Sequence, residues 1–123
     1  MTTVMLVDDS ATMLMSLKTI LTKAGYSVET AGHGREALDK LSAGLRPNLI
    51  ISDVNMPQMD GISFTREARK SAGMRFTPIL MLTTESEQSK RTEAKTAGAT
   101  GWLVKPVAPD QLLGVIKQVM PNA

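Results

Sequence analysis

Three carboxylates in this chain follow apolar runs that are typical of buried strands. Asp8 and Asp9 come directly after residues 3–7 (TVMLV), and Asp53 comes after residues 48–52 (NLIIS). Adjacent carboxylates repel each other, and each is more stable in water than beside a buried segment. The three acids therefore need a positive partner. Because oxygen-only sites that keep some waters suit magnesium and manganese, we expect them to bind Mg²⁺, with Mn²⁺ as an alternative.

Two further polar side chains follow apolar runs in the same way. Thr83 comes after residues 78–82 (PILML), and Lys105 comes after residues 101–104 (GWLV). The lysine supplies a positive charge, and the threonine supplies a hydroxyl that can donate to an anionic oxygen. With a metal ion and these two groups to neutralise its oxygens, a phosphoryl group could be attached to one of the carboxylates.

Segments with helical spacing lie between the apolar runs. Ser10 and Asp60 are placed to cap helices, and Pro109 suits the first turn of a last helix. The helices are expected between Ser10 and Gly25, in 34–44 (GREALDKLSAG), between Asp60 and Gly73, in 85–98 (ESEQSKRTEAKTAG) and from Pro109 onward. With a further strand at 26–31 (YSVETA), strand and helix alternate five times.

This alternation defines the expected fold class. Strands joined by helices run parallel, with right-handed crossovers and with helices on both faces of the sheet. We therefore expect an α/β fold with a five-stranded parallel sheet, a doubly wound (βα)5 domain. In such sheets functional groups lie beyond the carboxyl ends of the strands. If the first strand is central, the acids, the threonine and the lysine come within a few ångströms of one another.

Length and composition fit one globular domain. The chain has 123 residues, of which 42% are hydrophobic and 21% charged, and it contains no cysteine, which excludes disulfides and thiol nucleophiles. No run approaches the roughly 20 apolar residues of a membrane span, and no signal peptide is recognisable. The formal charge is +2, with Lys and Arg scattered. We expect a cytoplasmic protein with neither nucleic acid nor membrane as partner, and we expect His33, in a predicted loop, to be solvated.

Four motifs occur in order at the predicted strand ends: LVDDS (6–10), ISDVNMPQMDG (51–61), MLTTESE (81–87) and GWLVKP (101–106). With them the chain resembles, over essentially its whole length, the receiver domain of two-component response regulators. It is most similar to the single-domain, CheY-like chemotaxis members. The resemblance implies the flavodoxin-like strand order 2-1-3-4-5 and a histidine kinase that phosphorylates Asp53. It also implies one receiver domain over 1–123 with no attached output domain.

The resemblance assigns the acids and their neighbours to metal binding and hydrolysis. Asp9 and Asp53, with the backbone carbonyl of Asn55, would bind the metal, and Asp8 would act through a metal-bound water. Asn55 and Glu85 stand two residues after the phospho-acceptor and the switch threonine, where family members tune their dephosphorylation rate.

The resemblance also assigns roles at the last two strands. Lys105 would contact the phosphoryl group, and the Lys105–Pro106 peptide bond would be cis. Thr83 would move towards the phosphate when it is present. Trp102, at a place where the family commonly has Tyr or Phe, would change rotamer along with it.

The implied function is a stand-alone phospho-switch rather than an enzyme, with autophosphorylation from small phosphodonors and autodephosphorylation. A monomer would bind its target through the face made by 85–98, 101–104 and 109–119. The expected target is a flagellar motor switch protein of bacterial chemotaxis, and a phosphatase is a further expected partner. The basic residues of this face that would meet a partner peptide are Lys90, Arg91, Lys95 and Lys117, beside Trp102.

Other functions remain open. A phosphorelay intermediate or a non-chemotaxis single-domain receiver would share every site residue. A phosphatase of the haloacid dehalogenase type also uses Mg²⁺ and a lysine, but its acids form a D-x-D pattern, whereas Asp8 and Asp9 are adjacent. A flavin-binding protein of the same architecture would bring its phosphate against this acidic pair, which would repel it. A phosphorylation-independent scaffold is disfavoured because no acid of the motif is missing.

Overall fold

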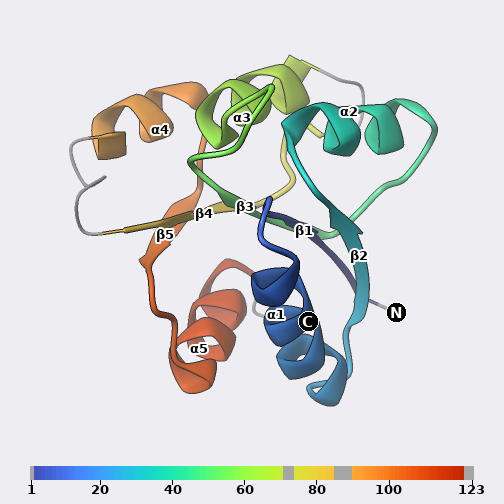
Figure 1. Ribbon diagram of the computed structural model, residues 1–123, viewed down its shortest axis with the longest axis vertical. Helices are drawn as coiled ribbons and strands as arrows, with labels where there is room; N and C mark the ends of the chain where they lie inside the picture. Colours follow the sequence, from blue (N-terminus) through green and yellow to red (C-terminus); the bar gives the residue numbers. More distant parts are fainter. Residues whose placement is uncertain (1, 71–73, 85–89, 121–123) are drawn as a thin grey trace.

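Five parallel strands form the centre of the structure, in the order β2-β1-β3-β4-β5 (Figure 1). The computed structural model describes residues 2–70, 74–84 and 90–120. Within them the strands are β1 (Thr3–Val7), β2 (Ser27–Ala31), β3 (Leu49–Asp53), β4 (Ile79–Thr83) and β5 (Gly101–Val104). The expected fold class and strand order are confirmed.

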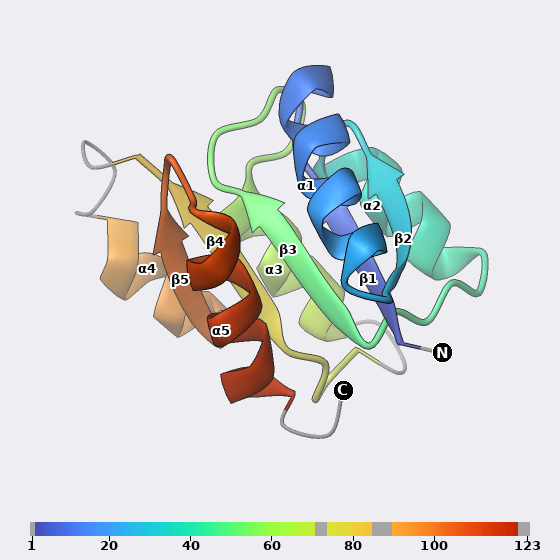
Figure 2. The ribbon, with the colours of Figure 1, turned by 90° about the horizontal axis from the view of Figure 1, so that it is seen from below.

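Helices cover both faces of this sheet (Figures 1 and 2). One face carries α1 (Ala11–Lys23) and α5 (Pro109–Val119), and the other carries α2 (Gly34–Ser42), α3 (Gly61–Lys70) and α4 (Arg91–Ala97). Each face has its own apolar core, one built around Met5, Ile50 and Phe64, the other around Leu6, Ile51 and Leu112. Burial on both faces explains why the strands read as continuous apolar runs. None of the described helices has the length and hydropathy needed to cross a bilayer.

The middle strands end one residue later than the apolar runs predict. Asp53 pairs with Leu82, and Thr83 pairs with Val104, so both polar residues belong to the sheet ladder rather than to the loops that follow. The ladder extends further because the amide of Val54 donates to Leu82 O at 3.2 Å. The phospho-acceptor candidate and the threonine are therefore held by rigid strand ends.

The helix caps follow the prediction at two positions and differ from it at a third. The amide of Met13 donates to Ser10 Oγ at 3.2 Å, and Asp60 Oδ1 accepts from the amide at position 63 at 2.8 Å. His33 is more than a solvated loop residue, because its Nδ1 accepts a hydrogen bond from the amide of Glu36 and so caps α2. The Glu36 carboxylate accepts in turn from the amide at position 32, an arrangement close to a capping box.

Gly61 is required by the close approach of α3 to the end of β3. A methyl group at this position would lie 2.0 Å from the carbonyl oxygen of Asp53 and 2.7 Å from Cε of Met81. The amide of Gly61 donates to Val54 O at 2.8 Å, which keeps the two backbones together. The first residue of α3 thus packs directly against the backbone of the acceptor candidate.

We predict that Gly61→Ala lowers the free energy of unfolding by about 2 kcal/mol, because the methyl group must displace backbone in a packed core. Gly114→Ala is the matched control. A methyl group at Gly114, inside α5, meets no atom within 4 Å, so this variant should gain about 0.5 kcal/mol from helix propensity. Urea unfolding measures both changes. A Gly61→Ala protein as stable as the wild type would contradict the close packing.

Candidate functional site

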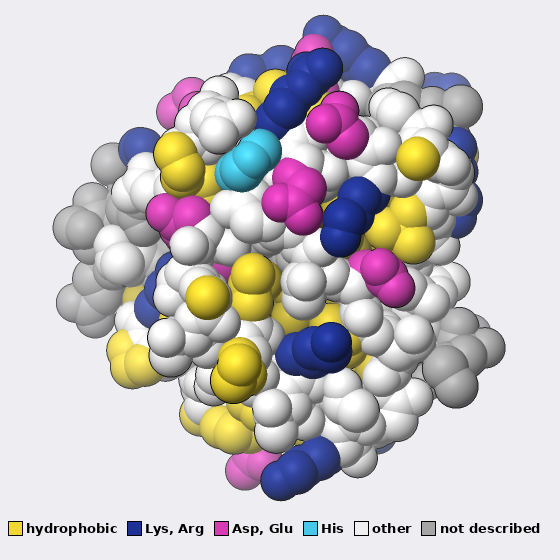
Figure 3. Space-filling model, turned by 45° about the vertical axis from the view of Figure 1, so that its right-hand side comes forward, with side chains coloured by type: hydrophobic (Ala, Val, Ile, Leu, Met, Phe, Trp, Pro, Cys, Tyr) yellow, Lys and Arg dark blue, Asp and Glu magenta, His cyan; other side chains and the backbone are white. Residues whose placement is uncertain are grey.

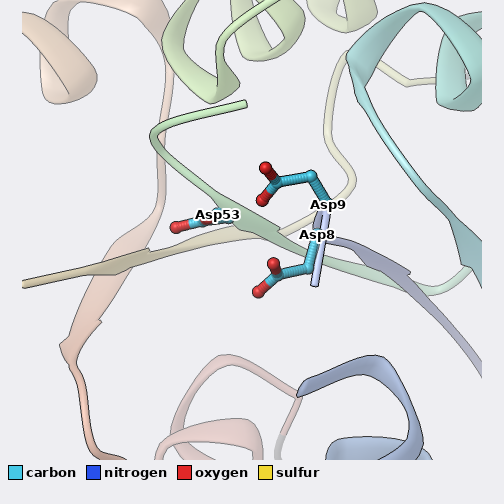
Figure 4. Close-up of side chains that lie close together, drawn as sticks. All are labelled: Asp8, Asp9 and Asp53. Carbon is cyan, nitrogen blue, oxygen red and sulfur yellow. The ribbon is translucent and has the colours of Figure 1, made fainter. Parts of the chain in front are cut away.

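Three aspartates converge at the carboxyl edge of the sheet, where β1 and β3 end side by side (Figure 4). One oxygen from each of Asp8, Asp9 and Asp53 lies within 4.8 Å of the others. Asp8 and Asp53 are buried, at 1% and 6% exposure, whereas Asp9 is exposed. Oxygen donors with one side open to solvent are the set that Mg²⁺ prefers, since it keeps several waters. The residues present therefore fit this ion.

Lys105 contacts both buried carboxylates. Its Nζ lies 3.0 Å from Asp53 Oδ1 and 3.5 Å from Asp8 Oδ2. The backbone also fixes this lysine, because its amide donates to Thr83 O at 2.6 Å. The Lys105–Pro106 peptide bond is cis, as the resemblance implies. The ammonium therefore occupies the same edge of the sheet as the acids.

The surroundings of Asp53 disfavour its ionised form. Burial raises the pKa of its carboxyl from 3.8 to about 6, against the opposing hydrogen bond from Lys105, and the charge of Asp8 raises it as well. Burial lowers the pKa of Lys105, but its hydrogen bond and charge interactions with the two acids outweigh burial, and the net shift is upward. A bound divalent cation would favour the ionised form of Asp53.

Two buried polar atoms have no hydrogen-bond partner among the described residues. One is Thr83 Oγ1, at the end of β4, and the other is Trp102 Nε1, on β5. Leaving such a group unsatisfied costs about 1–3 kcal/mol. Thr83 follows Leu82, the residue that pairs with Asp53, so its backbone lies at the same edge of the sheet as the acids. The indole of Trp102 is covered by the guanidinium of Arg91, 4.4 Å from the ring centre.

Asn55 and Glu85 are the two residues expected to tune dephosphorylation. Asn55 is exposed in the loop after β3, and its Oδ1 accepts from Lys90 Nζ at 3.4 Å, a contact that sequence reasoning missed. Glu85 lies outside the described residues.

The basic residues assigned to the target-binding face do not all lie together. A hollow of about 370 Å³ between α4 and β5 is lined by residues that include Arg91, Lys95 and Trp102. Lys117 instead lines a separate hollow beside Tyr26. Of the basic residues expected on the target-binding face, the structure therefore places Arg91 and Lys95 at one hollow and Lys117 at another. On the face of the molecule shown in Figure 3, the described Lys and Arg side chains are dispersed among acidic and apolar ones.

Comparison with known proteins gives a consistent set of relatives. Residues 4–117 match the family model of the response regulator receiver domain. Chemotaxis protein CheY1 of Helicobacter pylori (strain ATCC 700392 / 26695) is 36% identical over 117 residues, which are 94% of this chain and 94% of that protein.

Solved structures are similar as well. The structure of Vibrio cholerae chemotaxis protein CheY4 matches with a TM-score of 0.91 and 50% identity, covering 97% of this chain and 98% of that one. The receiver domain of sensor histidine kinase PA1611 from Pseudomonas aeruginosa PAO1, described with a magnesium ion coordinated in its active site cleft, matches with a TM-score of 0.89 and 27% identity. It covers 98% of each chain.

The raised pKa of Asp53 predicts a stability change in protein freed of divalent cations. An acid with a higher pKa in the folded state keeps its proton longer there, so wild-type stability falls as the pH rises from 3.8 to about 6 and then levels off. Asp53→Asn avoids this loss. We expect it to raise the free energy of unfolding by about 1 kcal/mol at about pH 7.5, after discounting for partial solvation, and by nothing at about pH 4.

Urea unfolding in chelator at both pH values makes this measurement. The exposed acid Glu29 on β2 provides the control, since Glu29→Gln also removes one negative charge but lies on another part of the sheet. An equal gain for Asp53→Asn at both pH values would show that the raised pKa of Asp53 is not its cause.

Proposed function

The chain belongs to the response regulator receiver family, and from this we propose that Asp53 accepts a phosphoryl group from a histidine kinase in a Mg²⁺-dependent reaction. Members of the family are signalling switches of two-component systems rather than classical enzymes. The observation that supports the assignment to Asp53 is its environment. Among the described residues it is the one carboxylate that is buried, ends a central strand and lies 3.0 Å from the ammonium of Lys105.

In the proposed metal site Asp9, Asp53 and the backbone carbonyl of Asn55 bind Mg²⁺, and Asp8 acts through a water. When bound, the ion neutralises oxygens of the phosphoryl group. The clustering of the three carboxylate oxygens supports this site, as does the magnesium described for the PA1611 receiver domain.

In the proposed transfer, an oxygen of the ionised Asp53 carboxylate attacks phosphorus, and the bond from phosphorus to the kinase histidine breaks. The ammonium of Lys105 moves its hydrogen bond from the carboxylate to a phosphoryl oxygen and keeps its ion pair with Asp8. The hydroxyl of Thr83 donates to another phosphoryl oxygen, which satisfies a buried group that lacks a partner. Small phosphodonors would replace the histidine in autophosphorylation, and water would later hydrolyse the acyl phosphate, at a rate that Asn55 and Glu85 tune.

The proposed output is a change at β5 that a target protein reads. Thr83 pairs with Val104 and accepts a backbone hydrogen bond from Lys105, so movement at Thr83 is coupled directly to the strand that carries Trp102. The target would bind the face formed by α4, β5 and α5. Relatives named as chemotaxis proteins support a role in that pathway. We propose a flagellar motor switch protein as its target and a phosphatase as a further partner.

We further propose that the chain acts in the cytoplasm as a monomer. A phosphorelay intermediate or a receiver of another pathway is the alternative, and the identity of the partner distinguishes them.

We expect Mg²⁺ to raise the melting temperature of the wild type, because binding only to the folded state contributes about 2.7 kcal/mol at a hundredfold excess over Kd. Asp9→Asn should lose most of this gain while folding normally, since Asp9 is exposed. Glu29→Gln, which removes an acid elsewhere, should keep it. Thermal melts with and without Mg²⁺ provide the measurement, and full retention in Asp9→Asn would remove that residue from the metal site.

Acetyl phosphate with Mg²⁺ is expected to change the fluorescence of Trp102, the only tryptophan, and to leave Asp53→Asn unchanged. Without Mg²⁺ the wild type should also remain unchanged. Intact-mass measurement of the same samples provides a second readout. A phosphoryl adduct with silent fluorescence would keep the chemistry but exclude Trp102 as its reporter, whereas the absence of any adduct would refute the proposed function.

A further inference from the structure

Lys90 connects the start of α4 to the loop that follows the acceptor strand. It directly precedes α4, and its Nζ lies 3.4 Å from Oδ1 of Asn55, two residues after Asp53. A lysine ammonium only donates hydrogen bonds, so it must meet the carbonyl end of the Asn55 carboxamide. This contact holds a positive charge beside the loop that borders the acidic site.

The charges of the phosphorylated site leave a place for a second cation. An acyl phosphate on Asp53 carries close to two negative charges at neutral pH, and Asp8 and Asp9 add one each. A divalent ion and the ammonium of Lys105 together compensate three of these charges. About one negative charge is left over.

We infer that Lys90 is a second lysine of the phosphoryl site. Its ammonium, positioned by the side chain of Asn55, stabilises the phosphorylated form of Asp53 electrostatically from the solvent side. Lys105 acts from within the site through direct contact, whereas Lys90 acts across the loop and depends on Asn55 for its place. The inference rests on the proposed function and adds a residue to it.

Fluoroberyllate, a non-covalent mimic of a phosphoryl group on aspartate, tests this at equilibrium in the presence of Mg²⁺. We expect Lys90→Met to weaken the binding of fluoroberyllate by about two- to fivefold, which is the range for a partly exposed charge pair. Binding is measured by ¹⁹F NMR. The loss should shrink when salt is raised from about 50 mM to about 500 mM, because screening weakens such pairs. Lys90→Arg keeps the charge and the donors and should bind as the wild type does.

Lys18→Met is the matched control, since it removes the same charge from an exposed position in the middle of α1. It should leave the affinity unchanged. Asn55→Ala keeps the backbone carbonyl but removes the contact with Lys90. If Asn55 positions the lysine, adding Lys90→Met to Asn55→Ala should weaken binding less than Lys90→Met does in the wild type.

Equal affinities for Lys90→Met and Lys18→Met would overturn the inference while leaving Asp53 as acceptor. A full additional loss in the Asn55→Ala background would overturn the positioning by Asn55. A wild-type protein that binds no fluoroberyllate would instead refute the proposed function, and the inference with it. Melting temperatures of all variants, which should match the wild type, exclude unfolding as the cause.

Discussion

The clustering of Asp8, Asp9 and Asp53, two of which contact the ammonium of Lys105, is the interaction on which the rest of the structure depends. Two of these acids are buried, and the pKa of Asp53 is raised to about 6, so the site destabilises the ionised protein. The sheet tolerates this because both of its faces are covered by apolar cores. Local strain of this kind, held in place by a well-packed scaffold, is typical of functional sites. It also gives the site its chemistry, since a cation or a rearranged lysine would relieve the repulsion.

The site combines a rigidly held acceptor residue with buried polar atoms that have no hydrogen-bond partner among the described residues. Asp53 is the last residue of β3, and the start of α3 packs against its backbone, so the backbone of the acceptor is held in place. Thr83 Oγ1 and Trp102 Nε1, by contrast, are buried without hydrogen-bond partners among the described residues. A new anionic oxygen at the end of β3 would satisfy the first of these. The β4–β5 ladder and the stacked guanidinium of Arg91 then provide a physical connection from that oxygen to the surface of α4.

The sequence allowed the fold and the convergence of the site to be predicted, because continuous apolar runs separated by helical segments permit few topologies. Other features depend on tertiary contacts that no local pattern carries. Whether Asp53 and Thr83 end their strands or follow them is decided by hydrogen bonds to neighbouring strands. His33 caps α2 because its Nδ1 accepts a hydrogen bond, which the residue type alone does not reveal. Lys117 and Lys95 line different hollows, a separation that appears only once helices are packed.

The central claim is that Asp53, rather than Asp8 or Asp9, carries the phosphoryl group, and chemical mapping tests it most directly. The protein would be incubated with acetyl phosphate and Mg²⁺ and then treated with borohydride, which reduces an acyl phosphate on aspartate to homoserine. Tandem mass spectrometry would locate the product. The account predicts homoserine at position 53 alone, and only when Mg²⁺ was present. Homoserine at position 8 or 9, or none at any position, would contradict it.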